Sequence, residues 1–127
     1  METVRGLVAF EGKRYLSLET YRKNGVGVRT PVWFAGANSG LYAYSTADSG
    51  KAKRIRRDGT ARIAPCDLRG NVTGEWIDAR ATIAGPDEFR RGMLLLDRKY
   101  WPWKQVLGLA ARLRRGGERV VIAIQPV

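Results

Sequence analysis

The sequence predicts a mainly β protein, an antiparallel barrel with helical additions. Six segments have the composition of strands and are separated by short turn signals. They fall into three hairpin-like groups, which is typical of antiparallel pairing. Helical signals occur in one short segment after the third strand and in a pair of segments before the last strand. The chain has 127 residues, 44% of them hydrophobic, and we therefore expect one domain over residues 1–127.

The first two predicted strands form a hairpin. In residues 13–22, Leu16, Leu18 and Thr20 alternate with residues of the opposite face. Asn24-Gly25 follows, a pair that favours a type I′ turn because both central positions need a positive φ. The second strand is predicted over residues 27–35.

Pro31 lies inside the second predicted strand. Proline cannot donate a ladder hydrogen bond, so this strand is expected at an edge or with a bulge. The backbone there would be able to bind the edge of a flat heterocycle. Trp33 would either stack nearby or fill the core.

A third strand is predicted over residues 41–46, and a short helix over residues 49–57. Asp48 and Ser49 are both good N-cap residues, and Asp58-Gly59 ends the helix. The remaining predicted elements are a strand at 60–65, a turn at 68–71, a long strand at 72–83, helices at 87–97 and 102–115, and a final strand at 120–124.

The formal net charge is +11, with 23 Lys and Arg against 12 Asp and Glu. Such a field attracts anions, and nucleic acid, a membrane surface and a polyanionic small molecule all fit it. Residues 51–57 contain five cations directly after Ser49-Gly50. A helix N-terminus with Lys51 at its mouth would bind a phosphate, although a solvated basic helix is the simpler interpretation. A Walker loop is disfavoured because Ser45 stands where its first glycine belongs.

Histidine is absent, and Cys66 is the single cysteine. These absences exclude a Ser-His-Asp triad, a Cys-His dyad, most zinc sites and a histidine-ligated haem, and no metal site is expected. Chemistry would then come from a bound organic cofactor. The sequence also lacks a signal peptide and any uncharged apolar stretch of roughly 18 residues. We therefore expect a cytoplasmic protein without an integral membrane segment.

Aromatic residues gather at Trp76 and at residues 100–103, where they would serve a core, a dimer interface or a site. From Arg90 onward there are nine Lys and Arg but only two acidic residues. These cations fit a solvated helix face or a surface along which an extended anion lies.

Four segments occur in an order and spacing that is more specific than any one motif: residues 21–25, 30–35, 41–57 and 64–67. Together they resemble the pyridoxamine 5′-phosphate oxidase-like superfamily, and within it the flavin/deazaflavin oxidoreductases that use coenzyme F420. The resemblance covers most of residues 13–85. It implies a split β-barrel of the FMN-binding type, an antiparallel Greek-key barrel that forms a homodimer with two cofactor sites at the subunit interface.

The resemblance also implies which residues bind the cofactor. The phosphate-binding segment would match Ser45, Thr46, Ser49, Gly50, Lys51 and Arg54. The strand along the flavin or deazaflavin ring would match Pro31, Val32 and Trp33, and Trp76 would approach from the partner subunit. Coenzyme F420 carries a phosphodiester and a polyglutamate tail, for which Arg57 and the neighbouring cations are candidates.

The function that follows is an F420-dependent oxidoreductase, which transfers a hydride between reduced deazaflavin and an unsaturated organic acceptor. Hydride transfer needs positioning more than acid-base side chains, so the lack of histidine is no obstacle. The alternatives are an FMN-dependent oxidoreductase of the pyridoxamine-phosphate-oxidase type, a non-catalytic F420 carrier and, on charge alone, a nucleic-acid-binding protein. No specific nucleic acid is expected, and the sequence identifies neither the small-molecule acceptor nor a catalytic residue.

Overall fold

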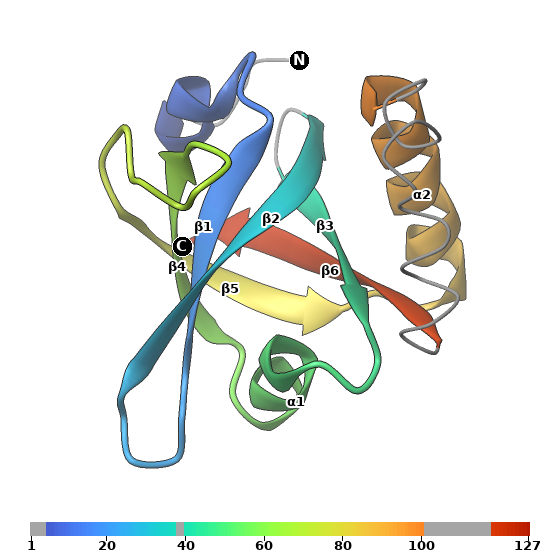
Figure 1. Cartoon of the computed structure of the whole chain (residues 1–127). Coiled ribbons are helices and arrows are strands. Elements are labelled where there is room, and N and C mark those ends of the chain that lie inside the picture. Colours follow the sequence, from blue (N-terminus) through green and yellow to red (C-terminus); the bar gives the residue numbers. More distant parts are fainter. Residues whose placement is uncertain (1–4, 38–39, 101–117) are drawn as a thin grey trace.

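The computed structural model describes residues 5–37, 40–100 and 118–127 (Figure 1). Six strands are present, as predicted: β1 (Tyr15–Tyr21), β2 (Gly27–Ala37), β3 (Gly40–Thr46), β4 (Thr60–Cys66), β5 (Ile77–Ile83) and β6 (Arg119–Pro126). The helices are a 3-10 helix η1 (Arg5–Phe10), α1 (Gly50–Arg57) and α2 (Pro86–Tyr100). Within these residues no helix has the length and apolar character needed to cross a membrane.

The strands close into a barrel in the order β1-β2-β3-β6-β5-β4, and every neighbouring pair is antiparallel. Three consecutive strands, β1 to β3, lie side by side, and β4 returns to pair with β1. This arrangement defines a Greek key. The predicted mainly β, antiparallel Greek-key barrel is therefore confirmed.

The barrel interior is filled by alternate residues of each strand. Leu16 and Leu18 of β1 and Val32 and Phe34 of β2 belong to this core. Its two ends are closed by helices, with residues of η1 at one end and Ile55 of α1 at the other (Figure 1). η1 was not predicted from the sequence.

A second apolar cluster joins α2 to the outside of the barrel. Met93 and Leu96 pack against Tyr44, Val121 and Ala35. The Tyr44 hydroxyl donates a hydrogen bond to Oδ1 of Asp97 over 3.2 Å. The helix predicted at 87–97 is therefore present and slightly longer, whereas the helix predicted at 102–115 lies outside the described residues.

The first hairpin turn differs from the prediction. Gly25 has a φ of 86°, but no described residue other than glycine has a positive φ, so Asn24 does not meet the type I′ requirement. The amide of Gly25 donates to the carbonyl of Arg22, and the amide of Arg22 donates to the carbonyl of Val26. The loop thus has three residues and a bulge at Gly25.

The long strand predicted over residues 72–83 is also wrong in its first half. β5 begins only at Ile77, and Val72 forms a single isolated bridge with Cys66. The register is the physical reason: Val72 lies opposite Cys66 and Ile77 lies opposite Ile63, so the four residues 73–76 face only two residues of β4 and cannot pair with them continuously. As a result Trp76 precedes the strand.

Candidate functional site

Strands β2 and β3 diverge at the end of the barrel that α1 covers. Residues 27–33 of β2 pair with β1, whereas pairing with β3 is confined to Phe34–Ala37. From Tyr44 onward β3 pairs only with β6. Within the described residues, one backbone edge of residues 27–32 is therefore without a strand partner. Figure 1 shows the two strands separating toward α1.

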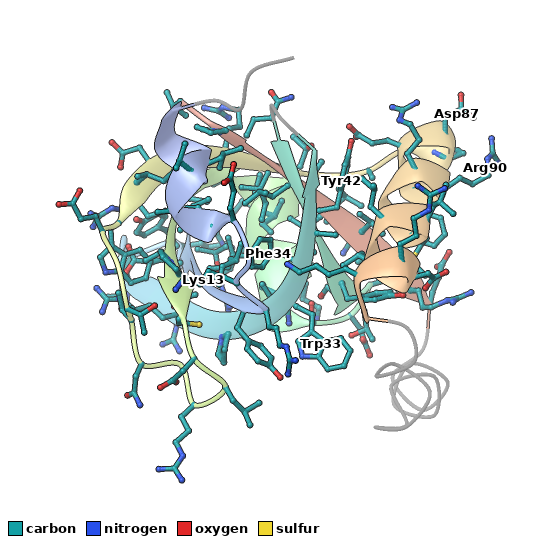
Figure 2. The ribbon with its side chains drawn as sticks, turned by 90° about the horizontal axis from the view of Figure 1, so that it is seen from above. Lys13, Trp33, Phe34, Tyr42, Asp87 and Arg90 are labelled. Carbon is teal, nitrogen blue, oxygen red and sulfur yellow. The ribbon has the colours of Figure 1, made fainter. Side chains whose placement is uncertain are left out.

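The three β2 residues expected along a ring have different surroundings. Pro31 is exposed and lies on the stretch that pairs with β1 alone, although β2 is not an edge strand of the closed barrel, because its last residues pair with β3. Trp33 is half-buried and meets Tyr15 edge-to-face, with 6.3 Å between ring centroids. It lies outside the barrel, while Phe34 lies in its middle (Figure 2). Val32 is buried in the barrel core, so only its backbone faces a ligand at this edge.

The first turn of α1 follows directly after β3. Ser49 is the N-cap, and its hydroxyl accepts the amide of Ala52 at 3.1 Å. The hydroxyls of Ser45 and Ser49 lie 2.7 Å apart. The amides of Gly50 and Lys51 come next at the N-terminus of the helix, where amide groups and the helix dipole favour an anion.

Arg54 extends back across this first turn. Its Nε donates to Oγ1 of Thr20 over 2.7 Å. Its Nη1 lies 2.9 Å from the position that a Cβ on Gly50 would occupy. A side chain at position 50 would therefore displace the guanidinium, and glycine there permits its close approach to the helix N-terminus.

Positive charge accumulates around Arg54. Burial lowers the pKa of Arg54, and the charges of Arg22 and Arg57 lower it further. Arg57 donates to the carbonyl of Tyr21, and Arg56 to that of Ala47. In the part of the chain that the structure describes, none of Arg22, Arg54 and Arg57 forms an ion pair with a carboxylate. An anion at this position would relieve the mutual repulsion of these guanidinium groups.

Six of the predicted cofactor residues thus come together at one place. Half-buried Lys51 and Thr46 join the two serines, Gly50 and Arg54 around the start of α1, while Arg57 follows at the end of the same helix. Among the described residues there is no group of three or more His, Cys, Asp or Glu side chains that would hold a metal.

Trp76 lies elsewhere, on the outer face of the barrel. The guanidinium of Arg29 lies 4.5 Å from its ring centroid, and that of Arg62 lies 5.6 Å away. Beneath them is Glu19, which accepts hydrogen bonds from Arg29 at 2.8 Å and from the hydroxyl of Tyr21 at 2.6 Å. Within its own chain Trp76 therefore belongs to an arginine-aromatic cluster on β1, β2 and β4.

Sequence reasoning missed Thr20 as a part of the site. It continues the inward alternation of Leu16 and Leu18, and the only signal was a polar residue at the end of an apolar face. No sequence pattern links it to Arg54, because the two residues are 34 positions apart.

No protein-family model matches the chain, and no curated protein sequence matches it. Solved structures share its fold. HutZ, the heme storage protein from Vibrio cholerae, superposes with a TM-score of 0.71 at 13% identity, covering 100% of this chain and 92% of that one. A proposed pyridoxamine 5′-phosphate oxidase from Listeria innocua gives 0.64 at 14% identity, covering 96% and 90%. An F420 reductase gives 0.61 at 19% identity, covering 95% and 92%. At these identities the likeness establishes the fold that the chain shares with them.

Proposed function

We propose that this protein is an F420-dependent oxidoreductase that transfers a hydride between reduced deazaflavin and an unsaturated organic acceptor. The observation that carries the proposal is that two features occur toward the same end of the barrel, the end that α1 covers (Figure 1). One is the unpaired edge of β2, and the other is the cluster of cations and hydroxyls at the start of α1. A flat ring with a phosphate-bearing side chain requires both features within one ligand's reach.

The residues divide the binding work between them. Backbone groups of residues 31–33 would hydrogen-bond the ring edge, and the half-buried Trp33 would limit access of water to it. The phosphate would be held by Lys51, Arg54 and the first amides of α1. When bound, the coenzyme supplies the hydride chemistry, and the protein supplies position and electrostatics.

The charge distribution favours F420 over FMN. Beyond the first turn, exposed Arg56 and Arg57 and exposed Lys53 continue the positive surface along α1. A single phosphate would contact only Lys51 and Arg54. A phosphodiester followed by several carboxylates would also contact Lys53, Arg56 and Arg57. FMN is the alternative cofactor in the same fold. A non-catalytic F420 carrier is the second alternative, because a heme storage protein shares this fold.

The proposal includes a homodimer with a cofactor site at each side of the interface. One chain supplies the β2 edge and the α1 cations, and the outer-face cluster around Trp76 would meet the cofactor of the partner subunit. The exposed Leu68 and Val72 lie on the same β4–β5 loop as Trp76 and would be covered in such a dimer.

Cofactor titrations test the proposal directly. Purified apoprotein is titrated with F420 and, in parallel, with FMN, while the fluorescence of each chromophore is followed. We expect F420 to bind more tightly; tight FMN binding without F420 binding would contradict the choice of cofactor. Reduced F420 is then offered with a panel of conjugated acceptors, and binding without any oxidation of the coenzyme would favour the carrier.

A further inference from the structure

Thr20 is a buried polar residue at the end of β1. Its side chain is 0% exposed, and it lies on the inward face with Leu16 and Leu18, at the end of the barrel that α1 closes. A hydroxyl in such surroundings is costly unless it is hydrogen-bonded. Its Oγ1 accepts a hydrogen bond from Nε of Arg54 over 2.7 Å.

This hydrogen bond restricts where the rest of the guanidinium points. The group is planar, so the direction of the Nε–H bond together with the Cδ–Nε bond defines the plane that holds the two terminal nitrogens. One of these, Nη1, lies over Gly50 at the N-terminus of α1. The terminal donors of Arg54 are thereby held at the first residue of the helix.

Electrostatics alone would move Arg54 away from this position. Arg22 and Arg57 both repel it, and burial removes part of its hydration. The bond to Thr20 opposes these effects without neutralising the charge, as a carboxylate partner would. The cation therefore keeps its full charge for a ligand.

We propose that Thr20 is a positioning residue that acts through Arg54 to hold the guanidinium ready for the phosphate group of the cofactor. The inference rests on the proposed function, because it concerns the phosphate end of the same site. The competing explanation is that Thr20 and Arg54 merely close one end of the barrel. In that case their loss would change the stability of the fold, and it would affect the binding of phosphate-bearing and phosphate-free ligands equally.

The test compares three proteins, the wild type, Thr20→Val and Thr20→Ser. Valine keeps the shape of threonine but removes the hydroxyl, and serine keeps the hydroxyl. Each is titrated with F420 and with its deazaflavin chromophore that lacks the phosphodiester and tail. We expect Thr20→Val to weaken F420 binding about tenfold, as expected for a lost hydrogen bond to a charged group. The phosphate-free chromophore should bind unchanged, and Thr20→Ser should stay within about twofold of the wild type.

Equal weakening for both ligands, or no weakening for either, overturns the inference while leaving the proposed function intact. If the wild type binds no deazaflavin, the proposed function fails, and the same proteins are titrated with inorganic phosphate while the unfolding temperature is followed. If phosphate raises the unfolding temperature of wild type and Thr20→Ser but not of Thr20→Val, the positioning role is supported. If phosphate does not raise the unfolding temperature of wild type, the positioning role is overturned. Should Thr20→Val fail to fold, Gly50→Ala provides the second variant, because its Cβ displaces Arg54 without touching Thr20.

Discussion

The cations around the first turn of α1 differ in how firmly they are held. Arg54 is fixed through Thr20, and Arg57 is tied to the carbonyl of Tyr21. Lys51 is half-buried, whereas Lys53 is exposed. A side chain that is already held loses less conformational entropy when it binds a ligand. Arg54 is therefore better prepared to bind a ligand than the exposed Lys53.

Replacing Lys51 by alanine tests its contact with the cofactor. We expect Lys51→Ala to weaken F420 binding by about 1.5 to 3 kcal/mol, the range for hydrogen bonds to charged groups. Lys13→Ala is the matched control, because it removes the same charge from an exposed position outside α1. The measurement is the dissociation constant of each variant, and equal losses in both would reduce the role of Lys51 to general electrostatic attraction.

Glu19 has a predicted effect on acid stability. Burial raises its pKa, but hydrogen bonds from Tyr21 and Arg29, together with the charges of Arg29 and Arg62, outweigh burial and bring the pKa below its ordinary value of 4.5. A lowered folded-state pKa contributes stability above the unfolded value and loses it as the pH falls through the folded value. Folding should therefore weaken below about pH 4.5 partly through this residue.

The variant Glu19→Gln should destabilise the protein by about 1 to 2 kcal/mol at pH 7, with a difference from wild type that shrinks toward pH 3. Denaturant unfolding at several pH values measures it. Asp78→Asn is the control, because Asp78 is 81% exposed and its contact with Arg62 spans 3.5 Å. A difference for Glu19→Gln that stays constant with pH would contradict the assignment.

At the level of elements, the start of α1 would serve two purposes in the proposed function. The same turn that ends β3 and caps the helix also presents the amides and hydroxyls of the proposed anion site. Helix α1 has eight residues, too few to be stable alone in water, so its position depends on the cap and on burial of Ala52 and Ile55. Cap and site are therefore linked through Ser49.

Two substitutions at Ser49 separate these purposes. Ser49→Ala should lower the free energy of unfolding by about 1 kcal/mol through loss of the cap, and it should also weaken the binding of the cofactor. Ser49→Asp keeps a good cap, so its stability should stay near that of wild type while its carboxylate repels the phosphate. Thermal unfolding and F420 titration are measured on both. Undiminished F420 affinity in Ser49→Asp would remove the helix N-terminus from the site.

At the level of the whole molecule, the barrel is closed, but β2 and β3 separate at the end where the cofactor is proposed to bind. The core continues around all six strands, and residues 27–32 of β2 pair with β1 alone. An unpaired edge is a hazard for aggregation, and Pro31 and the charged Arg29 lie on this stretch. In the proposed dimer the cofactor would cover the edge and the partner would cover the outer face.

Sedimentation of the intact protein tests the dimer. We expect a particle of about twice the 14.2 kDa chain mass, and F420 at about 100 times its dissociation constant should stabilise the fold by about 2.7 kcal/mol. Dilution that dissociates the dimer should also weaken the binding of the coenzyme, because each site would lose the residues supplied by the partner. A monomer that binds F420 with the same affinity at every protein concentration would contradict a site shared between subunits.

Local sequence signals determined most of the architecture. Strand alternation, the cap at Ser49 and the turn at 68–71 act over a few residues, so they are legible in the chain itself. The same locality explains the errors. The sequence pair Asn24-Gly25 fits more than one hairpin loop, and the composition of residues 72–76 did not reveal that they lack matching partners on β4.

Tertiary structure alone decided which of these local features meet. It separated β2 from β3 to leave a backbone edge, placed Val32 in the core, and brought Thr20 to Arg54 across 34 positions of sequence. It also placed Trp76 between two arginines on the outer face. Contacts between distant residues depend on how the barrel closes, and no local pattern carries that information. The sequence therefore predicted an anion site that includes Lys51 and Arg54, and the fold added the contact between Arg54 and Thr20.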